Sequence, residues 1–391
     1  MNDYSTYISM LSSSVEQFRC PKKRNKKTPC YGSLRIHAGQ TRKLPHLKDV
    51  HEVWSGRLEC TECRATYPIL SGVAILVPDV RSYLLTHAKG IAQVVPDSEI
   101  PKEHLREYLE AKSEIQSEHI EEDLEAERVT ALYVMNHYLR STSLDPQTKP
   151  TWWHPQSGVG SPLMDSLIRQ YWDHGPFDQL SQWLRAEPQS PKNTIELGCG
   201  VGGLYASLKP MIGKYLGVDS SFGSIALARH LALGLPYARE LRIPEDLLQG
   251  PVSRPLKLPQ AQSCTGQADF IVGDFDHIPV ATGIWNLSIS LNMIDMLEDP
   301  AALPKTQFNL IQSSGLAIQS CPYIWHPLVA KRLRKSLPPQ YRLSSSAAVE
   351  WLYQNAGFEI TKSVQNIPWL FFKHVRQLEI YSVHAFVARK P

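Results

Sequence analysis

A glycine-rich turn between a strand and a helix constrains the fold of this chain more than any other feature. An apolar run at 194–197 leads into Gly198, Gly200, Gly202 and Gly203, and the residues that follow predict a helix. Glycine lets the backbone turn sharply and approach a bound ligand closely, where a side chain would block the approach. The spacing also satisfies the dinucleotide-binding pattern, so the turn predicts a ligand-binding loop without deciding which ligand it takes.

Polar or aromatic side chains lie at or near the carboxyl ends of four successive predicted strands: Glu196; Asp219; Asp274 with Phe275; Asn292 with Asp295. Open α/β sheets bind their ligands at this edge. The two carboxylate oxygens of Asp219 suit both hydroxyls of a ribose. Asp274 and Phe275 suit an adenine, as an acceptor for its amine and an aromatic neighbour for its ring. Glu196 is close to where a positively charged ligand group would lie.

The order of the predicted elements indicates the fold class. From Asn193 onward strands and helices alternate, which predicts an α/β fold with a parallel sheet covered on both faces. A Pro- and Gln-rich stretch at 240–267 interrupts this order and is expected to be an inserted surface loop. The length of 391 residues suits two or three domains. The expected division is a cysteine-containing module at 1–80, a helical linker or cap at 81–185 and an α/β domain at 186–391.

The residues from about 190 to 391 resemble the class I methyltransferases that use S-adenosylmethionine, which have a Rossmann-like sheet. The resemblance implies that Glu196 and the glycine backbone hold the methionine part of the cofactor. The cofactor-binding residues that it implies are Glu196, Gly198, Gly200, Gly202, Asp219, Ser220, Asp274, Phe275 and Asn292. Because the sulfonium already carries a good leaving group, the enzyme's task is to align the reacting atoms and remove water.

A second pattern lies where the acceptor of the methyl group would bind. It consists of N-x-I-D-x-L-x-D-P from Asn292, S-x-P-Y-x-W from Ser320, and a hydrophobic Ile-Pro-Trp segment at 367–369. The pattern resembles the methyltransferase domain of ovothiol biosynthesis, although Cys321 stands where a serine is expected. The resemblance implies a small polar amine, imidazole or thiol compound as the acceptor.

Three residues of this pattern are candidate catalytic residues. Asn292 could accept the proton of the nucleophile and so orient its lone pair. Asp295 could act as a base, but an acid near a helix N-terminus also stabilises the helix dipole. Tyr323 could donate a hydrogen bond to the substrate, or it could close the end of the sheet.

The N-terminal cysteines predict a metal site. Cys60 and Cys63 have the two-residue spacing of a zinc knuckle. The second pair, Cys20 and Cys30, has nine residues between its members instead of the usual two to four. Residues 18–80 resemble the small zinc-ribbon subunit that activates tRNA, rRNA and release-factor methyltransferases, chiefly through the block C-x-x-C-x-x-x-Y-P-I. A reduced cysteine cluster without metal is the alternative.

Composition narrows the class of protein. A net charge of +3 gives no overall nucleic-acid footprint, although a basic run is present at Lys22, Lys23, Arg24, Lys26 and Lys27. No apolar run reaches the length of a membrane helix, no signal peptide is recognisable, and seven scattered cysteines suit a reducing compartment. We therefore expect a cytoplasmic protein without a membrane partner, and the sequence leaves its oligomeric state open.

The sequence predicts an S-adenosylmethionine-dependent methyltransferase, with structural zinc, that acts on a nitrogen or sulfur of a small metabolite or peptide side chain. One alternative keeps this chemistry but makes the substrate RNA or a translation protein, with the zinc module as a docking element. The other alternative is an inactive scaffold that binds the cofactor without turnover.

Overall fold

The computed structural model describes most of the chain: residues 14–23, 29–43, 51–118, 130, 132–138, 162–232, 241–243, 254–256, 268–374 and 377–391. Most of the basic run at 22–27 and most of the expected insertion at 240–267 lie outside the described residues. None of the described helices has the length and apolar character that a membrane span requires.

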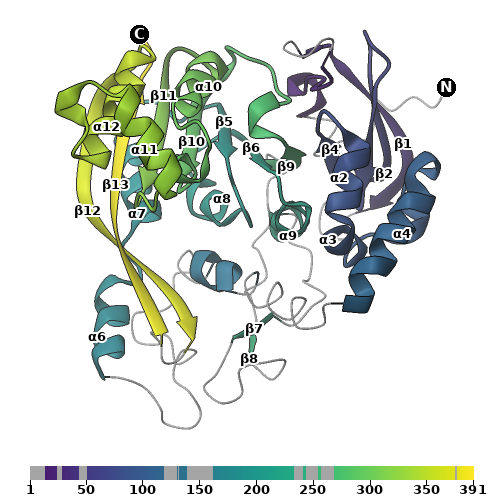
Figure 1. Cartoon of the computed structure of the whole chain (residues 1–391), viewed down its shortest axis with the longest axis horizontal. Helices are drawn as coiled ribbons and strands as arrows, with labels where there is room; N and C mark the ends of the chain where they lie inside the picture. The colour runs from purple at the N-terminus through teal and green to yellow at the C-terminus, as the bar shows by residue number, and fades with distance from the viewer. Residues whose placement is uncertain are drawn as a thin grey trace.

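Five parallel strands form the centre of a mixed sheet: β5 (Asn193–Leu197), β6 (Lys214–Asp219), β9 (Ala268–Gly273), β10 (Trp285–Leu291) and β11 (Ile311–Cys321). Their spatial order is β9-β6-β5-β10-β11, so the direction of strand addition reverses between β5 and β10. A long hairpin of β12 (Glu359–His374) and β13 (Gln377–Arg389) completes this side, with β13 antiparallel to β11. The predicted α/β sheet is therefore confirmed, with a Rossmann-like order of strands (Figure 1).

The N-terminal strands extend the same sheet. They are β1 (Leu34–Lys43), β2 (His51–Cys60), β3 (Thr66–Leu70) and β4 (Val73–Leu76), paired antiparallel in chain order. β4 then pairs parallel with β9, with Ala74 opposite Ile271 and Leu76 opposite Gly273. Because of this pairing, the sheet runs without a break through eleven strands from β1 to β12.

Helices cover both faces of the sheet. Successive side chains of a strand point to opposite faces, so apolar residues on both faces need a cover. In β5, Ile195 and Leu197 face one apolar cluster, so the intervening Glu196 faces the opposite side. The apolar cluster on the face of Ile195 also contains residues of α10 (Ala302–Leu310), α12 (Ser345–Asn355) and the cysteine module. The apolar cluster on the opposite face contains residues of the helices α2 (Val80–Thr86), α3 (Ala88–Ala92), α4 (Lys102–Glu118), α6 (Pro162–Tyr171), α7 (Pro176–Arg185), α8 (Gly203–Leu208) and α9 (Phe222–Ala232).

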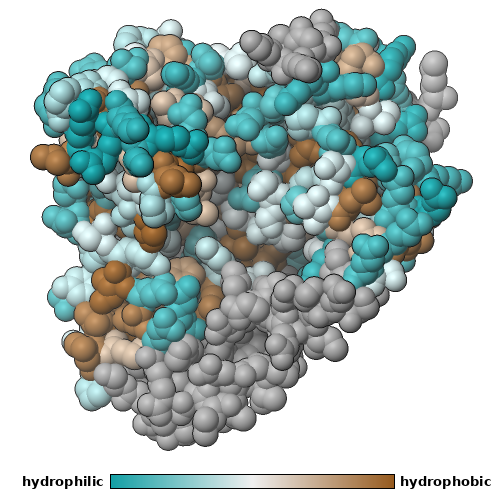
Figure 2. Space-filling view, viewed as in Figure 1, coloured by the Kyte–Doolittle hydropathy of each residue, from teal (hydrophilic) through white to brown (hydrophobic). Residues whose placement is uncertain are grey.

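The remaining elements are short. They are α11 (Pro327–Ser336), the 3-10 turns η2 (Val15–Gln17), η3 (Asp97–Glu99), η6 (Phe275–His277), η7 (Ile294–Met296) and η8 (Pro339–Tyr341), and a two-stranded sheet of β7 (Leu241–Ile243) with β8 (Arg254–Leu256). Hydrophilic side chains cover much of the described surface in the view of Figure 2, with hydrophobic side chains scattered between them.

A buried ion cluster joins the N-terminal strands to the central sheet. The Arg229 guanidinium on α9 forms ion pairs with Glu52 on β2 and with Asp269 on β9. The side chains of both acids are completely buried, and that of Arg229 is 3% exposed. Since a buried charge is costly unless it is paired, these contacts bind three separate elements into one core.

Candidate functional site

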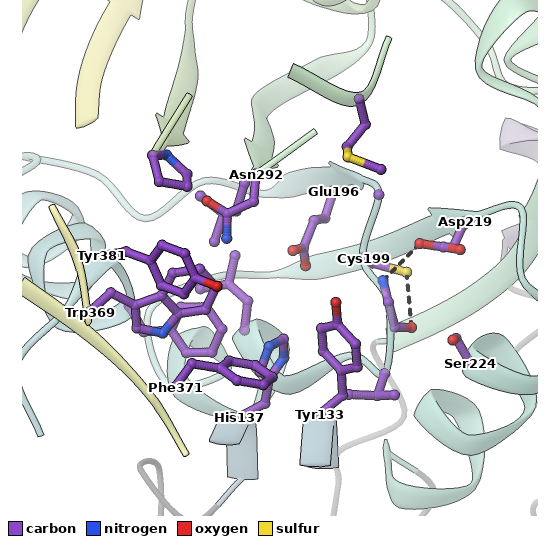
Figure 3. Close-up of a pocket in the computed structure, with 18 of the residues that line it drawn as sticks. Tyr133, His137, Glu196, Cys199, Asp219, Ser224, Asn292, Trp369, Phe371 and Tyr381 are labelled. Carbon is purple, nitrogen blue, oxygen red and sulfur yellow. Dashed lines mark hydrogen bonds between the residues drawn. The ribbon is translucent and has the colours of Figure 1, made fainter. Parts of the chain in front are cut away.

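A cavity of about 510 Å³ opens at the carboxyl ends of the central strands, where their order reverses. This is the position at which open α/β sheets bind ligands, and the volume lies in the range of small-molecule sites. Figure 3 shows two kinds of wall, with Asp219 and the glycine turn on one side and the rings of Trp369, Phe371 and Tyr381 on the other. Glu196 and Asn292 lie between them (Figure 3).

The glycine turn depends on glycine for both conformation and space. Gly198, Gly200 and Gly202 all have a positive φ, of 73°, 51° and 74°. A Cβ on Gly202 would lie 2.9 Å from the Phe270 ring, whereas one on Gly200 would meet nothing within 4 Å. Gly198 and Gly200 line the cavity, and Gly202 begins α8 behind them. At Gly198 and Gly200 the turn therefore presents bare backbone to the cavity, which lets a ligand approach closely.

Asp219 lines the cavity and is held by backbone donors. Its Oδ2 accepts a hydrogen bond of 2.9 Å from the Gly200 N–H, and its Oδ1 accepts one of 2.9 Å from the Ser221 N–H. Burial raises the pKa of this carboxyl above its usual range, and the backbone N–H groups partly oppose the rise. Each oxygen keeps a lone pair for a ligand hydroxyl. Ser220, the next residue, is not among the residues that line the cavity.

Glu196 is a buried acid in the cavity wall. Burial raises the pKa of its carboxyl to about 8, the Tyr215 phenol opposes the rise by donating to Oε2, and the Asp219 carboxylate adds to it. The carboxyl is therefore mostly protonated at neutral pH. A cation placed beside it would favour ionisation, because opposite charges stabilise each other strongly where water is excluded.

Asn292 and Asp295 line the cavity where β10 ends. The backbone of Asn292 is left-handed, with φ 53°, and its N–H donates to the Ser320 carbonyl at 2.7 Å. The Oδ1 of Asn292 is buried and has no hydrogen-bond partner among the described residues. Asp295 accepts a hydrogen bond of 2.6 Å from the Ile324 N–H, which ties the loop after β10 to the loop after β11. The Asn292 amide oxygen is thus an unused acceptor that suits an N–H or O–H of a ligand.

Three other predicted site residues do not line the cavity. The Tyr323 phenol lies 2.7 Å from Nδ1 of His384, and its ring stacks on Trp325. Asp274 caps η6 by accepting a hydrogen bond of 3.0 Å from the Asp276 N–H. Phe275 packs against the apolar cluster that includes the cysteine module. The structure therefore shows no contact between these three side chains and the cavity, and their binding or catalytic roles remain predictions.

The other wall is aromatic, and of its rings sequence analysis assigned only that of Trp369 to the acceptor side. Tyr133, His137 and Phe177 come from helical segments, and Tyr381 comes from β13. The Lys373 ammonium lies 4.8 Å from the centre of the Phe371 ring and 3.6 Å from the Glu379 carboxylate. Side chains alternate along a strand, so the position of Trp369 in β12 could also have placed Phe371 and Lys373 on the same face. No comparable signal marks Tyr133, His137 or Phe177.

The four predicted metal ligands come together in the N-terminal module. The sulfurs of Cys20, Cys30, Cys60 and Cys63 all lie within 4.8 Å of one another, and none forms a disulfide. Zinc bound at about 2.3 Å by four thiolates in a tetrahedron would hold the sulfurs about 3.8 Å apart. The Cys20–Cys63 and Cys30–Cys60 distances are 3.5 Å and 3.8 Å, so the cluster fits such an ion.

The wide spacing of the first cysteine pair has a local explanation. The Cys30 N–H donates to the Lys22 carbonyl at 2.7 Å, and the Tyr31 N–H donates to the Cys20 carbonyl at 3.0 Å. Lys23 and Pro29 form an antiparallel bridge next to these contacts, one step further into the spacer. The two ends of the long spacer are therefore paired, which brings Cys20 and Cys30 close together despite the nine residues between them.

Comparisons with known proteins show distant similarity of fold. No protein-family model matches the chain, and no curated protein matches it. One chain of a solved complex between the Haloferax volcanii Trm112 methyltransferase activator and a second protein is 15% identical; the match covers 58% of this chain and 93% of that chain, with a TM-score of 0.36. Magnesium protoporphyrin IX methyltransferase from Synechocystis is 18% identical, with 66% and 99% covered and a TM-score of 0.37. The [4+2]-cyclase SpnF is 12% identical, with 55% and 81% covered and a TM-score of 0.37. Similarity at this level identifies neither a family nor a substrate.

Proposed function

We propose that the chain is an S-adenosylmethionine-dependent methyltransferase that acts on a nitrogen or sulfur of a small polar metabolite or peptide side chain. One observation carries the proposal: a single cavity combines a bare glycine turn, the buried acids Glu196 and Asp219, and the unused Asn292 acceptor. These groups match a ligand with a cationic amino-acid end and two ribose hydroxyls. When bound, S-adenosylmethionine would supply an electrophilic methyl group on its sulfonium.

The residues at the glycine side of the cavity would hold this cofactor. Glu196 and the backbone of the turn would bind the amino-acid end, and Asp219 would bind the ribose. Ser220, Asp274 and Phe275 follow β6 and β9 at the same edge of the sheet, and we retain them as proposed ribose and adenine contacts. Residues that follow neighbouring strands at one edge of a sheet can bind the same ligand, which supports these assignments.

The residues at the aromatic side would hold the acceptor. The rings of Trp369, Phe371 and Tyr381 would exclude water from the acceptor atom. Asn292 Oδ1 would accept a hydrogen bond from the acceptor and so orient its lone pair. Asp295 would receive the acceptor's proton on its carboxylate, which the Ile324 N–H holds in place. For Tyr323 we propose a positioning role, since its bond to His384 fixes the turn whose neighbours Pro322 and Ile324 line the cavity.

A cell extract incubated with methyl-labelled S-adenosylmethionine tests the reaction. The wild-type protein should label a species of small mass or a peptide, and Asp219→Ala should label nothing above background. Label on RNA or on a translation protein would instead support the alternative substrates. Tight cofactor binding without any labelled product would support the inactive scaffold.

The pKa of Glu196 predicts a proton release on cofactor binding. At pH 7 the free carboxyl is mostly protonated, since its pKa is about 8, and it should ionise beside the ammonium of S-adenosylhomocysteine. Binding should therefore release close to one proton at pH 7, and affinity should rise as the pH increases from 6 to 8. Calorimetry in buffers of different ionisation enthalpy measures the release. The matched variant Glu196→Gln should lose it, and an equal release from both proteins would contradict the assignment.

We also propose that the four-cysteine cluster holds a structural zinc ion. Cys60→Ser should lower the zinc content of the purified protein and its thermal stability, because binding energy at a structural site contributes to folding. Cys199 is a buried cysteine outside the cluster, so Cys199→Ala should retain the metal. Elemental analysis decides the question, and a freshly purified wild-type protein without zinc would contradict the proposal.

A further inference from the structure

We infer that Tyr83 positions the loop that carries Asp219, so that the N-terminal part of the chain completes the cofactor site. The inference rests on the proposed function, because it treats Asp219 as a ligand-binding residue. Tyr83 does not line the cavity and is not a catalytic residue; it would act through the backbone next to Asp219.

The pairing of β4 with β9 brings Tyr83 to the correct edge of the sheet. Because β4 is parallel to β9, the chain leaves β4 at the edge where the ligand cavity opens. The Asp79 carboxylate caps α2 immediately afterwards by accepting a hydrogen bond of 2.9 Å from the Ser82 N–H. Tyr83 lies near the middle of this short helix, which Figure 1 shows close to β4.

The Tyr83 phenol donates a hydrogen bond to a residue far away in the sequence. It donates to the carbonyl oxygen of Ser220 at 2.6 Å, across 137 residues of sequence. Its ring stacks on His87 with 4.0 Å between the centroids, and only 9% of the residue is exposed. Burial raises the pKa of the phenol well above its usual range; a hydrogen bond from the Phe222 backbone partly opposes the rise, and the Asp219 carboxylate adds to it. The group therefore stays protonated and remains a donor.

The bond controls the orientation of one peptide group. The carbonyl of Ser220 and the N–H of Ser221 belong to the same peptide unit, which is planar. Tyr83 holds the oxygen of this unit, and Asp219 Oδ1 accepts from its N–H at 2.9 Å. With both ends held, the peptide fixes the carboxylate that would bind the ribose. Removal of the phenol would leave a carbonyl without its donor and let the peptide rotate.

The test compares two conservative variants. Tyr83→Phe removes the contact with Ser220. Tyr108→Phe is the matched control, since the Tyr108 phenol is also buried and donates to a backbone carbonyl, that of Ala88 at 3.3 Å. Neither Tyr108 nor Ala88 lines the cavity. Loss of one hydrogen bond that positions a ligand group should raise the Kd for S-adenosylhomocysteine about three- to tenfold in Tyr83→Phe. Tyr108→Phe should change the Kd less than about twofold, whatever its effect on thermal stability.

Hydrogen exchange provides a readout that needs no ligand. In the free protein the Ser221 amide should exchange faster in Tyr83→Phe than in wild type, and it should be unchanged in Tyr108→Phe. Equal exchange and equal Kd in Tyr83→Phe and wild type would overturn the inference. If wild type binds no S-adenosylhomocysteine, the proposed function fails, while the exchange of Ser221 still decides whether Tyr83 holds the loop.

Discussion

Replacement of Asp219 by alanine should abolish measurable binding of S-adenosylhomocysteine while the protein stays folded. The carboxylate would accept both ribose hydroxyls, and hydrogen bonds to charged groups contribute about 1.5–3 kcal/mol each. It also accepts from the Gly200 N–H, so its loss frees the turn that presents backbone to the cavity. Together these effects correspond to a loss of affinity of more than about a hundredfold.

The fold should survive this change because Asp219 contributes little to the core. Burial already raises the pKa of its carboxyl, which means that the charged form is not favoured by its surroundings. Asp178→Ala, which removes an acid of α7 outside the cavity, is the matched control and should bind as wild type does. Calorimetry measures the affinity and thermal denaturation checks the fold. Unchanged affinity in Asp219→Ala would remove the ribose assignment.

Replacement of Arg229 by leucine should destabilise the protein more than any other single change proposed. It leaves Glu52 and Asp269 buried without their cation, and a buried pair broken in this way costs about 3–5 kcal/mol. Without Arg229 both acids should have raised pKa values in the folded state, so the folded protein would bind more protons than the unfolded one. The loss of stability should therefore be larger at pH 8 than at pH 5.5.

Urea denaturation at the two pH values measures this effect. The control is Arg81→Leu, which breaks an exposed ion pair with Glu107 and should have little effect on the unfolding transition. An Arg229→Leu protein that unfolds like wild type at both pH values would show that the ion cluster does not hold the N-terminal strands to the sheet.

The central sheet and half of the cavity could be predicted because their signals are local. The apolar strand before Gly198, the acid at the end of β6 and the Asn292 pattern each lie within a few residues of sequence. The rule that ligands bind at the carboxyl ends of parallel strands then brings these residues together without further information. The structure places Glu196, Asp219, Asn292 and Asp295 in one cavity for this reason.

The N-terminal extension of the sheet and the aromatic half of the cavity depend on contacts between distant parts of the chain. The parallel pairing of β4 with β9 and the bond from Tyr83 to Ser220 leave no local pattern in the sequence. The orientation of the Tyr323 side chain depends on a left-handed backbone conformation, with φ 61°, which a tyrosine rarely adopts. The contributions of Tyr133 and Phe177 depend on how their helical segments pack over the glycine turn.

The central claim is that one cavity binds a sulfonium nucleoside, and a crystal structure with S-adenosylhomocysteine tests it most directly. We expect ligand density in this cavity, with the ribose hydroxyls on Asp219 and the amino-acid end at Glu196 and the glycine turn. Folded wild-type protein that shows an empty cavity at saturating ligand, and no heat of binding in calorimetry, would contradict it.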